Sequence, residues 1–196
     1  MIAEEILSSY QAKQVEIGKG EFLFMEGEKA RYYWQVIKGS VKMVNYSEDG
    51  QEFTQGMFSA EDSFGEPPLF TDIDYPSNAI AVEDSLLWRL PREQFLQLLK
   101  EHFEIHLQIT ATLCQRLYYK ATIMKEISSH APDHRILTLI DLLKEKQADP
   151  GAPYMVPFTR QQLADMTGLR VETVIRSIKS LEKAGKLKIE KRQVVR

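Results

Sequence analysis

The chain has 196 residues, 43% of them hydrophobic, so it is long and apolar enough to bury the core of one or two globular domains. Its first residues show no basic start and no apolar run, and no stretch reaches the about 20 apolar residues of a membrane span, so we expect neither a secretory signal nor a membrane segment. The formal net charge is −3, and the single cysteine, Cys114, excludes an intramolecular disulfide and fits a reducing cytoplasm.

Residues from about 15 to 90 predict a β-domain. Short apolar runs at 22–24, 32–37 and 41–46 are separated by turn signals such as Lys38-Gly39, and residues 80–90 supply the last strands. Many short strands at near-regular spacing are typical of a small antiparallel β-roll or jelly roll (a double-stranded β-helix), which can enclose one small ligand. Pro91 then opens a short helix that runs to Leu99.

From about residue 103 to 127 the pattern is that of one long helix. Its apolar positions follow steps of three and four residues, and they are Ile109, Leu113, Leu117, Met124 and Ile127. The helix either packs on its own β-roll or forms a two-helix seam with a second subunit. We favour the seam, and a homodimer, because the C-terminal segment predicts a helix-turn-helix, and such proteins usually read symmetric DNA sites as dimers.

A break follows the long helix at 128–132, where Pro132 bars its continuation, and we expect a hinge there. Residues 133–146 predict a further amphipathic helix with Ile136, Leu139 and Ile140 on its apolar side, and residues 149–153 predict a loop.

Residues 159–181 predict a helix-turn-helix. Thr159 and Gln162 form the pattern of a capping box, and Gly168 supplies the turn between two helices. The second helix places four apolar residues on one side, which are Val171, Val174, Ile178 and Leu181. The opposite side carries Glu172, Thr173, Arg176, Lys179 and Ser180.

The exposed side of that helix offers hydrogen-bonding groups suited to DNA. Glu172 can accept from cytosine N4, and Arg176 can donate two hydrogen bonds to guanine O6 and N7. A Glu-Arg pair four residues apart is also common on ordinary helices, but the capped helix and the glycine turn favour DNA binding. If Val171 reaches the groove it favours a thymine methyl at the neighbouring position; the alternative is that it turns into the core.

The charge of the chain is segregated in a way that supports this assignment. Residues 159–196 carry ten basic and four acidic side chains, so this end has a net charge of +6 and the rest of the chain −9. A basic end on an acidic body is typical of a phosphate-binding module attached to a domain with another task.

Residues 186–189 and 193–195 predict a small hairpin, or wing, around a turn at 190–192. The predicted DNA-contacting residues are Thr159, Arg160, Arg170, Val171, Glu172, Thr173, Arg176, Lys179 and Lys188.

The order of these parts resembles the Crp/Fnr family of bacterial transcription regulators along nearly the whole chain. The strongest local matches are Phe64-Gly65-Glu66 and the run 171–176. The resemblance implies an α+β fold with a cyclic-nucleotide-binding-like roll, a dimerisation helix and a winged helix-turn-helix. It also implies that Glu172 and Arg176 read a guanine-containing half-site of a palindromic double-stranded DNA site, and that RNA polymerase is a partner. Residues 168–173 are more similar to the Fnr branch, because the cyclic-AMP branch has an arginine where Val171 stands.

The resemblance also sets an expectation for the effector. In cyclic-nucleotide binders of the family a Gly-Glu pair holds the ribose and an Arg-Ser pair holds the phosphate. Gly65 and Glu66 are present here, but residues 74–78 contain no arginine, and a cyclic phosphate without a cation would be poorly bound. We therefore expect an effector other than cyclic AMP, or none. The candidate pocket comprises Gly65, Glu66, Ser77, Asn78 and Lys120.

A β-roll enzyme of the cupin type with an accessory helical domain is the alternative function. All four histidines lie in or beside the predicted helices, so the roll lacks the histidine cluster of such enzymes. His102 and His106 share ligand spacing on one helix, but no third ligand is near. We expect no metal, no cofactor and no catalysis. We divide the chain into a roll with flanking helices at 1–102, a dimerisation helix and hinge at 103–131, and a DNA-binding domain at 132–196.

Overall fold

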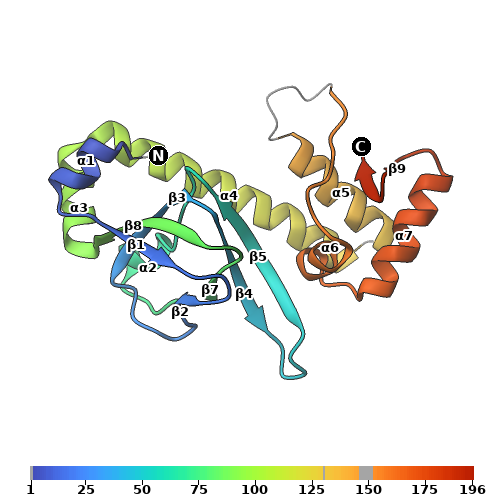
Figure 1. The fold of residues 1–196 in the computed structure, drawn as a ribbon, viewed down its shortest axis with the longest axis horizontal. Coiled ribbons are helices and arrows are strands. Elements are labelled where there is room, and N and C mark those ends of the chain that lie inside the picture. The colour runs from blue at the N-terminus through green and yellow to red at the C-terminus, as the bar shows by residue number, and fades with distance from the viewer. Residues whose placement is uncertain (1, 130, 146–151) are drawn as a thin grey trace. The chain divides into compact units, whose positions relative to one another are not determined.

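The computed structural model describes residues 2–129, 131–145 and 152–196, with the side chains of 126–129 left undescribed, and the described chain forms two compact units, Met1–Gln115 and Arg116–Arg196. The boundary falls inside α4 (Phe103–Ser129), which is one continuous helix (Figure 1). Each unit has its own hydrophobic core. In the described part of the chain, none of the helices is both long and apolar enough to cross a membrane.

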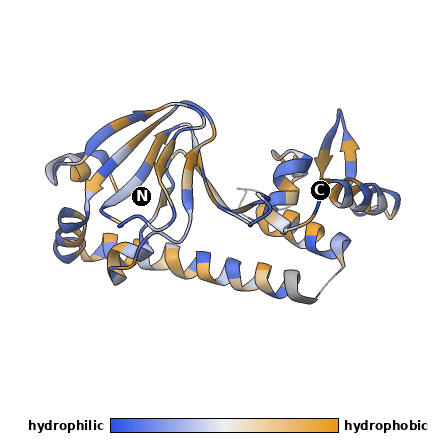
Figure 2. Ribbon diagram, turned by 90° about the horizontal axis from the view of Figure 1, so that it is seen from below, coloured by the Kyte–Doolittle hydropathy of each residue, from blue (hydrophilic) through white to orange (hydrophobic). Residues whose placement is uncertain are grey.

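The first unit is a β-roll of two four-stranded antiparallel sheets, which confirms the predicted roll. One sheet has the order β1-β8-β3-β6 and the other β2-β7-β4-β5. The strands of the first sheet are β1 (Lys13–Ile17), β8 (Ser85–Pro91), β3 (Tyr32–Lys38) and β6 (Ser63–Phe64). Those of the second are β2 (Phe22–Phe24), β7 (Asn78–Ala81), β4 (Ser40–Tyr46) and β5 (Glu52–Ser59). Hydrophobic and hydrophilic residues alternate along these strands because one face of each sheet is buried (Figure 2).

Helices cover the outer face of the first sheet. They are α1 (Glu4–Ser9), α3 (Arg92–Glu101) and the N-terminal part of α4, while the short α2 (Pro67–Thr71) follows β6. The ring of Tyr33 on β3 stacks on Phe95 of α3, with ring centroids 4.6 Å apart. The buried Gln35 side chain accepts from the backbone N–H of Ile2 at 3.1 Å and donates to its carbonyl at 3.0 Å, which fastens the N-terminal segment to the roll. The sequence did not predict α1 or α2, since both are shorter than two helical turns.

The position of Ile109 corrects one sequence prediction. We expected Ile109 in the seam between two subunits, but its side chain is 5% exposed and belongs to the core of the roll. Leu113 is half-buried against the same core. Leu117 and Met124, by contrast, are 69% and 70% exposed. The side chain of Ile127 lies outside the described residues. The periodicity was right, but one helix carries two apolar faces, and sequence alone assigned residues of both to one seam.

The second unit is a winged helix-turn-helix. It contains α5 (Pro132–Lys144), α6 (Arg160–Thr167), α7 (Val171–Lys183) and the hairpin of β9 (Lys188–Glu190) and β10 (Gln193–Val195). Three helices and the wing share one core, whose fully buried members include Ile136, Leu163 and Val174. The break between α4 and α5 falls where it was predicted. The predicted hinge residue His130 and the predicted loop up to residue 151 lie outside the described residues.

A third segment extends the wing. Tyr154 and Arg196 exchange backbone hydrogen bonds of 2.8 and 2.9 Å, and Val156 N–H donates to the Val194 carbonyl at 2.9 Å. The Arg196 guanidinium then pairs with Asp141 of α5, with Nε 2.6 Å from Oδ1, and donates from Nη1 to the Lys186 carbonyl at 2.8 Å. The wing is therefore joined to α5 by the Arg196–Asp141 ion pair as well as by the hydrophobic core.

Candidate nucleic-acid interface

The start of α6 is fixed by a reciprocal cap. Thr159 Oγ1 accepts from the Gln162 backbone N–H at 3.1 Å, and Gln162 Oε1 accepts from the Thr159 N–H at 2.9 Å. At the other end Gly168 takes φ of +65°, a left-handed conformation that favours glycine. These two features, both predicted from sequence, set the short turn into α7.

The helix α7 has one buried and one exposed side. Val174, Ile178 and Leu181 are between 0% and 4% exposed and pack in the core. On the opposite side Glu172, Arg176 and Lys179 are exposed, and Thr173 is half-buried. Arg176 Nη2 donates to Thr173 Oγ1 at 3.4 Å, a contact within one helical turn.

Two apolar residues lie at the edge of this surface, and they differ in how far they are exposed. Val171 is half-buried and packs against the core of the domain, which favours the alternative that its side chain turns inward. Ile175, which sequence reasoning did not single out, is 39% exposed. An apolar residue on the polar side of an amphipathic helix was the signal that could have identified it.

The N-terminus of α6 and the wing form the walls of a pocket of about 380 Å³. Its lining residues are 156–160, 192 and 193, so Arg160 and Arg192 both border it. Desolvation lowers the pKa of the Arg160 guanidinium, which nonetheless has an ordinary value high enough to keep it charged. Lys191 and Arg192 form the tip of the wing with φ of +48° and +71°. Two cations and a capped helix N-terminus around one hollow provide a surface suited to an anionic backbone. Arg170 and Lys188 are also exposed.

Two of the predicted effector residues of the roll, Glu66 and Asn78, form hydrogen bonds within the protein. Glu66 is 1% exposed, and one of its carboxylate oxygens accepts a hydrogen bond from the Ser63 hydroxyl. Asn78 accepts from the Glu26 N–H at 3.1 Å and donates to the Val44 carbonyl at 3.3 Å. Ser77 is fully buried, and its hydroxyl has no hydrogen-bond partner among the described residues.

An aromatic stack lies beside Gly65. The ring of Tyr75 stacks on Phe24, with centroids 3.6 Å apart and planes 8° from parallel. Gly65 has φ of +76°, and a Cβ there would come within 3.3 Å of the Tyr75 ring. The Tyr75 hydroxyl donates to the Tyr32 carbonyl at 3.2 Å, and burial raises its pKa to about 12. The loop in which a phosphate-binding arginine was missing thus inserts an aromatic ring into the roll.

Lys120 lies on α4 in the second unit, whereas the other four candidate pocket residues belong to the first. Desolvation and, as the smaller cause, the charge of Arg116 lower the pKa of the Lys120 ammonium. In the part of the chain that the structure describes, no three side chains among His, Cys, Asp and Glu are grouped to hold a metal ion.

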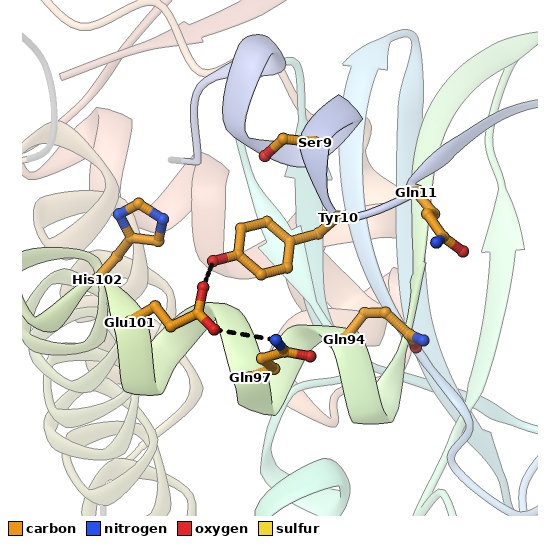
Figure 3. Close-up of a pocket in the computed structure, with 7 residues that line it drawn as sticks. All are labelled: Ser9, Tyr10, Gln11, Gln94, Gln97, Glu101 and His102. Atoms are coloured by element: carbon orange, nitrogen blue, oxygen red, sulfur yellow. Dashed lines mark hydrogen bonds between the residues drawn. The ribbon is translucent and has the colours of Figure 1, made fainter.

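A polar pocket of about 450 Å³ lies between the end of α1 and α3 (Figure 3). The Tyr10 hydroxyl donates to Glu101, and Gln97 Nε2 donates to the other oxygen of Glu101 at 2.9 Å. The bond to Glu101 raises the pKa of Tyr10, and the same bond lowers the pKa of Glu101. Figure 3 shows Tyr10 pointing at Glu101 across the pocket, so these groups fasten α1 to α3. Sequence reasoning missed this cluster because its members come from segments that are far apart in the chain.

Known proteins share both parts of the chain. The cyclic nucleotide-binding domain family matches residues 14–102, and the Crp-like helix-turn-helix domain family matches residues 134–196. The cAMP-activated global transcriptional regulator CRP of Pasteurella multocida is 31% identical over 82% of this chain and 78% of its own length. The transcriptional activator protein anr of Pseudomonas aeruginosa is 24% identical over 90% of this chain and 73% of its own.

A solved structure has a similar fold. FixK2 from Bradyrhizobium japonicum superposes with a TM-score of 0.77 over 94% of this chain and 91% of that one, at 22% identity, which shows likeness of fold alone. The two family matches follow each other in the order roll, then helix-turn-helix, and the Pasteurella relative matches 82% of the chain. The chain belongs to the Crp/Fnr family of DNA-binding transcriptional regulators.

Proposed function

We propose that this regulator reads a two-fold symmetric DNA site through Glu172 and Arg176 of α7. The observation that carries the proposal is the exposed polar side of α7, which lies on a helix whose other side is buried and whose start is held by a capped helix and a glycine turn. Arg176 donates to guanine O6 and N7, and Glu172 accepts from the amino group of a cytosine. Each half-site therefore contains a guanine–cytosine step.

The remaining cationic and hydroxyl groups bind the DNA backbone. Thr159 and Arg160 at the start of α6 face one phosphate, and the pocket between them and Arg192 accommodates it. Arg170, Lys179 and Lys188 contact flanking phosphates. Such contacts position the protein on the duplex and depend on salt, but they carry little sequence information. Thr173 holds the Arg176 side chain in place.

The protein acts as a homodimer through α4. Among the exposed side chains of this helix, seven stand alternately four and three residues apart and form one stripe: Phe103, Leu107, Thr110, Cys114, Leu117, Ala121 and Met124. Within this stripe the large apolar members Phe103, Leu107, Leu117 and Met124 are 65%, 47%, 69% and 70% exposed. Alternating four- and three-residue steps are the spacing of a two-stranded coiled coil. A second copy of the same helix would cover the stripe, which includes Leu117 and Met124 of the seam predicted from sequence.

The effector is a molecule other than cyclic AMP, or the protein needs none. Three observations support this: the Glu66 carboxylate is bonded to Ser63, residues 72–78 contain no arginine, and Tyr75 stacks on Phe24 beside Gly65. If a ligand binds in the roll, Ser77, whose hydroxyl has no hydrogen-bond partner among the described residues, and the buried Glu66 are the groups that meet it, together with Gly65 and Asn78.

The chain works with RNA polymerase in the bacterial cytoplasm and catalyses no reaction, as its family membership suggests. Its α7 is closer to the Fnr branch, because Val171 takes the place of an arginine. The roll and flanking helices (1–102) form the sensor part, residues 103–131 the dimerisation helix and hinge, and residues 132–196 the DNA-binding part.

Selection from random DNA tests the proposal. Recovered sites are expected to show two-fold symmetry with half-sites about 10 bp apart, each with a guanine–cytosine step. Arg176→Ala should weaken binding by about 1–3 kcal/mol and abolish the guanine preference. Lys188→Ala is the control, since loss of a phosphate contact should weaken all sequences alike and reduce the salt dependence. Asymmetric sites, or an R176A protein that still prefers guanine, would mean that α7 is not the reading helix.

A further inference from the structure

Ile175 is the one large apolar side chain on α7 that the fold leaves exposed, and α7 is described throughout its length. It is 39% exposed, whereas Val174, Ile178 and Leu181 of the same helix are buried. Val171, the other apolar residue near the reading pair, packs against the core of the domain. Ile175 is therefore the one exposed large apolar side chain beside Glu172 and Arg176 on α7.

The helical spacing places Ile175 next to the groups that read bases. It precedes Arg176, and it stands three residues after Glu172 and four before Lys179. Residues three and four apart on a helix have Cβ atoms roughly 5–6 Å apart, so Ile175 belongs to the same surface as Glu172 and Lys179. If α7 reads DNA as proposed, a side chain in that position lies next to the base pair that Arg176 reads.

The chemistry of the major groove identifies its partner. Among the groups that base pairs present there, the thymine 5-methyl is the apolar one; the others are hydrogen-bond donors and acceptors. Ile175 has no donor or acceptor, so a base edge without a methyl would leave its alkyl group facing polar atoms. We infer that Ile175 reads the methyl group of a thymine adjacent to the guanine–cytosine step in each half-site. This inference rests on the proposed reading by α7 and moves the apolar contact, expected at Val171 from sequence, to Ile175.

Replacement of thymine by deoxyuridine removes this methyl and nothing else. In a site recovered by selection, each thymine beside the guanine–cytosine step is replaced in turn and the dissociation constant is measured by fluorescence anisotropy. The wild-type protein should lose about fourfold in affinity per half-site at one such position, as expected for one buried methyl group. Ile175→Ala should bind the thymine and deoxyuridine sites equally, and Ile175→Val should discriminate between them less than wild type. Because Ile175 is exposed, these variants leave the core of the domain intact.

A second base analogue separates this inference from the proposed function. Replacement of the guanine by 7-deazaguanine removes the N7 acceptor that Arg176 uses. If 7-deazaguanine weakens binding but deoxyuridine does not at any position, or if I175A still discriminates thymine from deoxyuridine, the inference about Ile175 is wrong while α7 remains the reading helix. If 7-deazaguanine has no effect either, the reading helix itself is misassigned.

Discussion

At the scale of single residues, the Tyr75 ring occupies part of the interior of the roll. The Tyr75 ring fills space beside Gly65 by stacking on Phe24, and its hydroxyl is satisfied by the Tyr32 carbonyl. Burial disfavours the phenolate and raises the pKa of Tyr75 from 10.0 to about 12. The folded state holds this proton more tightly than the unfolded chain does. The contribution of protonated Tyr75 to the free energy of unfolding is therefore complete below about pH 10 and is lost as the pH rises through about 12.

Tyr75→Phe should lower the free energy of unfolding at neutral pH by about 1 kcal/mol, the usual net value of one hydrogen bond. It should also remove one late-ionising tyrosine from the absorbance titration of the folded protein. Tyr119, whose pKa burial likewise raises to about 12, should keep its late step. Tyr46→Phe, at a side chain that is 46% exposed, is the control. An unchanged titration of Y75F above pH 10 would contradict the burial of this ring.

The same loop determines the response to cyclic AMP. Titration calorimetry should detect no binding tighter than roughly millimolar, which corresponds to about 4 kcal/mol. The physical reason is that a buried anionic phosphate needs a cation, and the loop that would supply it provides Tyr75 and Pro76 instead. Micromolar binding would contradict the prediction.

At the scale of elements, the helix caps and the contacts of the wing fix the position of α7. The Thr159–Gln162 capping box fixes where α6 begins, and Gly168 fixes where it ends. The Arg196–Asp141 pair joins the wing to α5, and the bond to Asp141 raises the pKa of Arg196, although exposure of 32% and 41% for the two side chains keeps the contribution of this pair small. The position of α7 therefore depends more on the caps and the core than on surface charges.

Thr159→Ala should destabilise the DNA-binding domain by about 1 kcal/mol, because the first turn of α6 loses its side-chain acceptor. Thr159→Ser keeps the hydroxyl and should retain nearly all of the stability. Urea unfolding followed by circular dichroism measures both variants. Equal stabilities of T159A and T159S would show that the cap contributes little to the fold of the domain.

The whole molecule is organised by the two apolar faces of α4. One face, with Ile109 and Leu113, packs on the roll, and the other repeats in steps of four and three and is exposed. A stripe of this length on a single chain has large apolar side chains in water, which favours a second copy as its cover. In a parallel pair of helices the two Cys114 side chains would face each other.

Leu117→Glu should convert the dimer to a monomer at micromolar concentration, because each seam would bury a pair of like charges. Gln115→Glu adds the same charge at an exposed position outside the stripe and should leave the dimer intact. Analytical ultracentrifugation distinguishes the two, and a short bismaleimide should cross-link wild-type Cys114 but not C114S. A dimeric L117E protein would place the interface elsewhere.

Much of this molecule was predictable from local pattern. The roll, the long helix, the capping box, the Gly168 turn and the buried side of α7 follow from spacing and turn chemistry, which act between residues close in the chain. Ile109 was misassigned because its burial depends on packing against the core of the roll, whose other members come from distant segments, and α1 was missed because it is shorter than two helical turns.

The sequence by itself determined the family, the polar side of α7 and the absence of an arginine in the loop before β7, since each is a matter of residue identity at fixed spacing. Only the tertiary structure decided that Tyr75 occupies the roll beside Gly65, that Val171 packs inward while Ile175 stays exposed, and which face of α4 is left uncovered. Amphipathic periodicity shows that a helix has an apolar face, but the packing of the other elements determines which apolar residues are covered and which remain free to bind a partner.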